Sequence, residues 1–159
     1  MGQIASFIVL QASAVPHLGF FSKPKLRLFR RPECMFNELL RPHVLHEYIF
    51  DAGDAAYIAL VFAWIDFIDQ TFSREVDPVV GSVRKNLGGS HWLLKFADQR
   101  LLPLLCKPIL ERDWPAFLMR IGIDYCSEYD LITFDTARLF VHDRLSELKP
   151  SEAMLISIG

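Results

Sequence analysis

Cysteine is scarce in this sequence, and its three copies form no recognisable disulfide or metal pattern. Cys34, Cys106 and Cys126 are an odd number, lie far apart and include no C-x-x-C pair. Secreted disulfide frameworks, zinc knuckles and thioredoxin-like sites all need paired cysteines. The first positive charge is Lys23, so the basic region that begins a signal peptide is also missing. We therefore expect a cytoplasmic protein.

An excess of positive charge is missing too. The 159 residues carry 17 Lys and Arg against 19 Asp and Glu, a net charge of −2 at neutral pH. Because phosphate binding needs surplus cations on one face, we expect no nucleic-acid partner. The longest unbroken apolar run, residues 55–65, is shorter than the roughly 20 residues that cross a bilayer. We expect no membrane partner either.

What the sequence does contain is enough apolar material for a core. Hydrophobic residues make up 52% of the chain and charged residues 23%, which excludes a disordered protein. Domains commonly span about 100–200 residues, so one domain accounts for the whole length. We therefore interpret residues 1–159 as a single domain.

Apolar stretches at both ends of the chain predict β-strands. Residues 4–10 and 153–158 are short, apolar and partly β-branched, as in strands buried on both faces. Between them the sequence predicts an edge strand over 23–32 and helices over 33–50 with a hinge near Pro42, 55–72, 78–87, 90–102, 114–121 and 133–148, the last capped by Thr133 or Asp135. The expected fold is therefore α+β and mostly helical, with a small sheet that pairs the N- and C-terminal strands.

Two histidines and a carboxylate lie close together in sequence, at His43, His46 and Glu47. On the expected helix these side chains share one face, and Asp51 or Asp54 follows one to two turns later. Imidazoles and carboxylates are suitable ligands for Zn²⁺ or Fe²⁺, so a small metal-dependent hydrolase is one hypothesis. However, the spacing matches no standard motif, and scattered surface histidines are the simpler interpretation. We therefore assign no metal and no cofactor.

The remaining candidates for catalysis are incomplete. Asp66 and Asp69 would form a general acid if buried, but they more simply mark where an apolar helix reaches solvent. His142 and Asp143 are similar to the doublet of HD-type phosphohydrolases, yet no later Asp follows, so we interpret the pair as chance. No cysteine has a histidine within a few residues, which is weak negative evidence because distant residues can meet in the fold. We predict no catalytic residues.

Charge is distributed unevenly along the chain. Residues 111–159 hold five basic and nine acidic residues, a balance of −4. An expected loop over 122–131 combines carboxylates and tyrosines, a mixture that suits docking of a basic protein surface. We predict that the partner-binding residues are Asp124, Tyr125, Glu128, Tyr129 and Asp130. A solvated loop that keeps the protein soluble is the alternative interpretation.

Several features together resemble the YfbM-like family of small bacterial proteins of unknown function. The N-terminal strand, a helix that Asp77 and Pro78 open and residues 87–89 close, and a final helix and strand over 134–158 are similar in order and placement. The family's Asp-Lys-x-Trp segment is replaced here by Asp-Ala-Gly-Asp at 51–54. The resemblance implies an α+β fold and a bacterial cytoplasmic protein, and it supplies no catalytic residues.

The leading hypothesis is a non-enzymatic bacterial interaction protein, in particular an immunity protein that binds and neutralises a cognate, basic toxin domain. It rests on the absence of a complete catalytic motif, on the single domain and on the acidic loop. The metal-dependent hydrolase is the first alternative. A structural homodimer is the second, because 13 Phe and 3 Trp in one small domain favour an exposed apolar patch.

Overall fold

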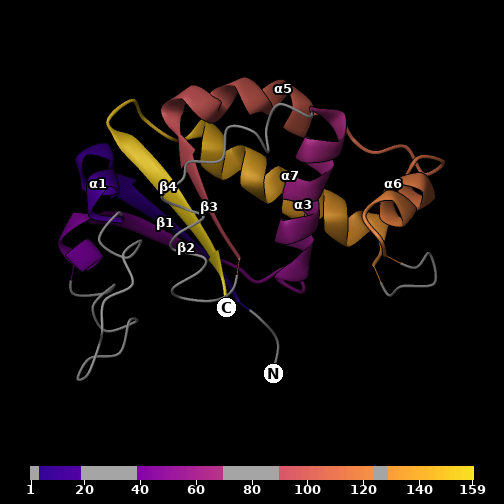
Figure 1. The fold of residues 1–159 in the computed structure, drawn as a ribbon, viewed down its shortest axis with the longest axis horizontal. Coiled ribbons are helices and arrows are strands. Elements are labelled where there is room, and N and C mark those ends of the chain that lie inside the picture. Colours follow the sequence, from indigo (N-terminus) through magenta and orange to yellow (C-terminus); the bar gives the residue numbers. More distant parts are fainter. Residues whose placement is uncertain (1–3, 19–38, 70–89, 124–128) are drawn as a thin grey trace.

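The structure is a computed structural model, and it describes residues 4–18, 39–69, 90–123 and 129–159 (Figure 1). The expected edge strand over 23–32 and the expected helix over 78–87 lie outside the described residues. In the described part, a twisted sheet is flanked by helices, and Ile4 is hydrogen-bonded to the C-terminal Gly159 at one end of the sheet (Figure 1).

Among the described residues, four antiparallel strands form one sheet in the order β2-β1-β4-β3. The central pair is β1 (Ala5–Gln11) and β4 (Glu152–Ile158), and the first residue of β1 lies opposite the last residue of β4. The edge strands are β2 (Val44–Phe50) and β3 (Ser90–Lys95). Strands that are apolar on both faces are stable only where both faces are covered, which explains the central position of the two terminal strands. The predicted pairing of the terminal strands and the α+β class are confirmed.

Two helices cover one face of this sheet and form the main core with it. α7 (Leu131–Ser146) packs on the sheet, and α3 (Ala56–Ile68) crosses α7 and packs against it (Figure 1). The ring of Phe140 in α7 lies edge-on to the Phe7 ring of β1 and the Phe50 ring of β2, with centroid distances of 5.0 and 5.4 Å. These contacts join the helix layer to both strands at one side of the sheet.

A smaller hydrophobic cluster covers the opposite face. The chain turns back there directly after β1, through the 3-10 turn η1 (Ala12–Ala14) and the short helix α1 (Val15–Leu18). The buried members of this cluster are Leu10, Leu18, Leu40 and Leu155. Because β1 and β4 contribute to both clusters, they are covered on both sides, as their apolar sequences require.

The helix expected over 33–50 is wrong for its second half. After the 3-10 turn η3 (Arg41–His43), the chain enters β2, which pairs with β1. Along β2 exposure alternates at its end, where Phe50 is buried and Ile49 is 56% exposed. Aromatic and β-branched residues favour such a half-covered strand, and pairing with β1 outweighs the three- and four-residue apolar spacing. The residues before 39 lie outside the described part of the chain.

The helix expected over 90–102 is also wrong at its start. Residues Ser90–Lys95 form β3, where Trp92 stacks on the Phe62 ring of α3 at a centroid distance of 4.5 Å. Helical structure begins with η5 (Phe96–Leu101) and continues into α5 (Leu102–Leu105). Pairing with β4 supplies this segment with hydrogen bonds and a packing partner that the sequence alone does not reveal.

Three other expected helices lie among the described residues, and all three are confirmed with small changes of bounds. α3 and α7 lie where expected, and α6 (Trp114–Arg120) begins at Trp114 with Pro115 in its first turn. α7 begins earlier than expected, because its capping residue is Asp130. Among the residues that the structure describes, no helix has the length and apolar character needed to span a membrane.

Candidate functional site

The residues of the alternative metal hypothesis do not share a face. His43 lies in η3, where its ring stacks on the His17 ring at a centroid distance of 5.3 Å. His46 and Glu47 are successive residues of β2, and successive side chains of a strand point to opposite faces. The expectation of one helical face is therefore wrong. In the described ranges no three His, Cys, Asp or Glu side chains are arranged to hold a metal ion.

Two of the five predicted partner-binding residues are described, and both make contacts within the protein. Asp130 caps α7, with its Oδ1 accepting a hydrogen bond from the Thr133 N–H at 2.7 Å. Its Oδ2 accepts a hydrogen bond from the Tyr57 hydroxyl at 3.0 Å. The Tyr129 ring lies edge-on to the Tyr57 ring at 5.2 Å. Asp124, Tyr125 and Glu128 lie outside the described residues, so their role stays a prediction.

These hydrogen bonds shift two ionisation equilibria. The backbone N–H of Thr133, followed by its side chain, lowers the pKa of the Asp130 carboxyl, and the Tyr57 hydroxyl adds to the effect. Burial raises the pKa of the Tyr57 hydroxyl, although the Asp130 N–H partly opposes this. Folding therefore favours an ionised Asp130 and a neutral Tyr57, which is the behaviour of a structural helix cap.

The carboxylates at the end of the apolar helix lie where that helix reaches solvent. Asp66 is in the last turn of α3, and Asp69 is the residue that ends it. Between them Phe67 and Ile68 are 41% and 37% exposed. Both aspartates are partly exposed, and both have interaction partners in the fold. This placement agrees with the simpler of the two interpretations of the pair.

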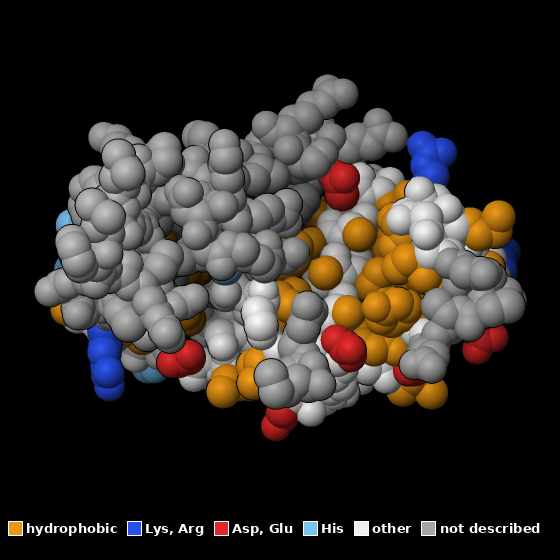
Figure 2. Space-filling model, turned by 60° about the horizontal axis from the view of Figure 1, so that its bottom comes forward, with side chains coloured by type: hydrophobic (Ala, Val, Ile, Leu, Met, Phe, Trp, Pro, Cys, Tyr) orange, Lys and Arg blue, Asp and Glu red, His pale blue; other side chains and the backbone are white. Residues whose placement is uncertain are grey.

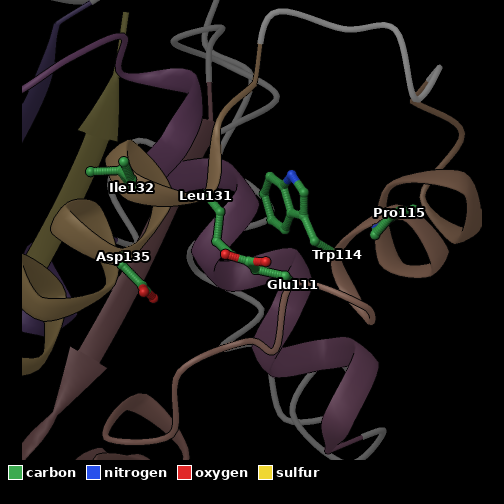
Figure 3. A pocket seen from close by; sticks show the side chains of 6 residues that line it. All are labelled: Glu111, Trp114, Pro115, Leu131, Ile132 and Asp135. Atoms are coloured by element: carbon green, nitrogen blue, oxygen red, sulfur yellow. The ribbon is translucent and has the colours of Figure 1, made fainter.

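An open groove of about 460 Å³ lies between α6, the start of α7 and the turn before α6 (Figure 3). Trp114 closes it from the core side, where its ring packs on the Phe134 ring at 5.0 Å. Ile132 lies at its rim and is 82% exposed. The lining residues are Glu111, Trp114, Pro115, Leu131, Ile132 and Asp135. Figure 2 shows hydrophobic side chains gathered on the side of the molecule that carries α6, with acidic side chains beside them.

The two carboxylates of the groove differ in their surroundings. Asp135 Oδ1 accepts a hydrogen bond from Arg138 Nε at 2.8 Å, so its charge is balanced within the protein. Glu111 is exposed, and within the described part of the chain it forms no ion pair. The groove therefore combines apolar contact area with one carboxylate that is available to a cation from outside.

A second cluster of reactive side chains lies where α5 meets α7. Cys106, which ends α5, has its Sγ 3.2 Å from Nε2 of His142 in α7. The other ring nitrogen, Nδ1, lies 3.0 Å from Asp143 Oδ1. The Cys106 side chain is exposed, and the His142 side chain is 25% exposed. The succession of His142 and Asp143 is interpreted as chance from the sequence alone, but in the structure the imidazole of His142 is in contact with a thiol.

A buried arginine holds the end of α5 against α7. Arg138, one helical turn before His142, is 4% exposed and donates from one guanidinium nitrogen to the Leu105 carbonyl. Leu105 directly precedes Cys106 and is itself fully buried. The guanidinium therefore ties the end of α5 to the same helix that carries the imidazole, and Asp135 balances its charge.

Gln99 forms a second link between the η5–α5 segment and α7. Its amide nitrogen, which carries two hydrogens, lies within hydrogen-bond distance of three backbone carbonyls at and just after the end of α7, those of Leu145, Ser146 and Leu148, at 3.0, 3.3 and 2.9 Å. The Leu145 carbonyl also accepts from the Leu148 N–H, and the amide adds to this as a C-terminal cap contributed by η5. Together with Arg138 it holds the η5 and α5 segment against α7 at two points.

Comparison with known proteins gives no match. No protein-family model matches the chain, and neither a curated protein nor a solved structure matches it. The resemblance to the YfbM-like family therefore stays a prediction.

Proposed function

We propose that this chain is a bacterial protein-binding module and that the groove beside α6 receives a basic, partly apolar surface of its partner. One observation carries the proposal: Glu111, an exposed carboxylate that no described side chain pairs with, borders the same groove as the highly exposed Ile132. A cation placed against Glu111 would bring its apolar neighbours onto Ile132 and Leu131. The partner's cation would then pair with a carboxylate, and its apolar side chains would be buried against apolar side chains of the groove.

An immunity protein that neutralises a basic toxin domain is the form of this function that we favour. Residues 111–159 carry a net charge of −4, and such a field attracts a cationic partner before contact as well as at contact. Asp124, Tyr125 and Glu128 belong to the same part of the sequence, and we propose that they extend the docking surface. Tyr129 and Asp130 contribute by fixing the start of α7 beside the groove.

Coexpression with the products of the neighbouring genes tests this proposal. For a product that copurifies, the dissociation constant is measured by titration calorimetry with the wild-type chain and two charge-reversed variants. Glu111→Lys is expected to raise the dissociation constant at least about tenfold, because it places like charges at the contact. Glu47→Lys makes the same change on an exposed position of β2 and is expected to stay within about twofold of wild type.

Three results would count against the proposal. One is that no neighbouring product binds, and another is that the product that binds is acidic. The third is that both variants weaken binding equally, which would place the contact elsewhere. The structural homodimer is tested separately by light scattering on the isolated chain. A dimer that Ile132→Asp converts to a monomer would assign the groove to self-association.

A further inference from the structure

Cys106, His142 and Asp143 have the order of contacts found in nucleophilic catalysis. The thiol sulfur is 3.2 Å from one imidazole nitrogen, and the carboxylate oxygen is 3.0 Å from the other. With the ring proton on Nδ1 donated to Asp143, Nε2 is free to accept the thiol proton. A nucleophile, a base in contact with it and a group that orients the base are thus present together.

We propose that these three side chains form a nucleophilic thiol site that accepts an acyl group from a thioester. The site lies on other residues than the groove, so it goes beyond protein binding and does not depend on it. Cys106 is exposed, which leaves its sulfur accessible to an incoming acyl donor.

The backbone around the thiol selects the class of donor. The N–H of Cys106 donates to carbonyls within α5, those of Leu102 and Leu104, and the N–H of Lys107 donates to Leu104. Neither N–H is therefore available to stabilise an oxyanion, which amide cleavage strongly requires. A thioester has a far better leaving group than an amide and depends less on such donors. Exchange of one thioester for another is the acyl transfer that this site supports best.

The step balances without a further reactant. His142 Nε2 takes the proton of the Cys106 thiol as the sulfur forms a bond to the acyl carbon. The bond between that carbon and the sulfur of the donor then breaks, and the proton on His142 passes to the departing thiolate. Nothing is oxidised or reduced, and the products are a thioester at Cys106 and a free thiol.

Arg138 and Gln99 act as positioning residues for this step. Both tie the segment that ends in Cys106 to α7, and neither needs to touch the acyl donor. Holding the sulfur against the imidazole before the donor arrives is what distinguishes a prepared nucleophile from an ordinary exposed thiol.

The test uses the full chain and the acetyl thioester of N-acetylcysteamine as the probe. Intact-protein mass spectrometry follows acetylation with time, and peptide mapping locates the acetyl group. We expect the label at Cys106, with His142→Ala reacting at least about tenfold more slowly than wild type. His46→Ala removes an exposed imidazole elsewhere and is expected to stay within about twofold.

Added imidazole separates a chemical role of His142 from a structural one. It should restore part of the acetylation rate of His142→Ala, whereas it should not accelerate Cys106→Ser. If His142→Ala does not fold, Asp143→Asn supplies the comparison, with an expected loss of about threefold because its carboxyl is largely exposed. The proposal is overturned if the variant used reacts as fast as wild type, or if the label appears only at Cys34 or Cys126.

Discussion

Tyr57 and Asp130 are joined by two hydrogen bonds although they lie 73 residues apart. The Tyr57 hydroxyl donates to Asp130 Oδ2 at 3.0 Å and accepts from the Asp130 N–H at 2.9 Å. α3 is thereby attached to the first turn of α7, next to the groove that we propose as the docking site. This link fixes where the main helix of the core begins.

Removing the hydroxyl should therefore destabilise the fold. We expect Tyr57→Phe to lower the free energy of unfolding by about 1–2 kcal/mol, because it leaves the Asp130 N–H and one carboxylate oxygen without this partner. Urea unfolding followed by tryptophan fluorescence measures the change. Tyr129→Phe is the matched control, since the Tyr129 ring packs on Tyr57 but makes no hydrogen bond among the described residues. A control that loses as much stability as Tyr57→Phe would contradict this explanation.

Stability should also depend on pH through the same pair. Asp130 has a lowered pKa in the folded state, so its contribution is present above its unfolded-state pKa and is lost as the pH falls below about 4. Tyr57 has a raised pKa, so its contribution is complete below about pH 10 and is lost as the pH rises further. Urea unfolding at several pH values should show that the free energy of unfolding falls less on acidification in Asp130→Asn than in wild type. Equal acid-side losses in the two proteins would exclude Asp130 as the group responsible.

Arg138 is expected to be the most costly arginine to remove in the described part of the chain. Arg138→Met should lower the free energy of unfolding by about 1–3 kcal/mol, because the Leu105 carbonyl loses its partner in a buried position. It should also slow acetylation of Cys106, since the thiol is no longer held against His142. Arg120→Met is the control, because Arg120 is exposed and near the end of α6. A variant that is less stable but reacts at the wild-type rate would refute the positioning role while leaving the structural one.

Zinc should not stabilise the protein through the residues first considered as ligands. His43, His46 and Glu47 do not converge, so an equimolar addition of Zn²⁺ is expected to leave the melting temperature of wild type and His46→Ala the same. Differential scanning fluorimetry decides this quickly. A clear increase in wild type that His46→Ala abolishes would restore the metal hypothesis.

The parts of the fold that follow from local pattern were predictable from the sequence. β1 and β4 are mostly apolar, and α3 has the length and composition of a buried helix, so their type and position are confirmed. β2 and β3 were not predictable, because both are edge strands whose structure depends on a neighbour distant in sequence. Trp92 is an example, since only the packing of β3 against α3 brings its ring onto Phe62. Long-range pairing, which no short window of sequence contains, decides such segments.

The candidate sites show the same limit. The His142 and Asp143 pair is visible in the sequence, but Cys106 lies 36 residues before the histidine and reaches it only through the packing of α5 on α7. Arg138, four residues before His142, is visible in the sequence too, but its burial and its hydrogen bond to the Leu105 carbonyl are not. For the groove, the acidic character of residues 111–159 was visible in the sequence. The ion pair between Asp135 and Arg138 was not, and neither was the lack of an ion pair at Glu111 among the described residues.

Hydrogen–deuterium exchange of the chain alone and with its copurified partner tests the proposed docking site most directly. We expect the partner to slow exchange in peptides covering 111–119 and 131–136, which contain the groove, and to leave exchange in β2 at 44–50 unchanged. Protection confined to β2, or to the α1 side of the sheet, would contradict a docking site beside α6.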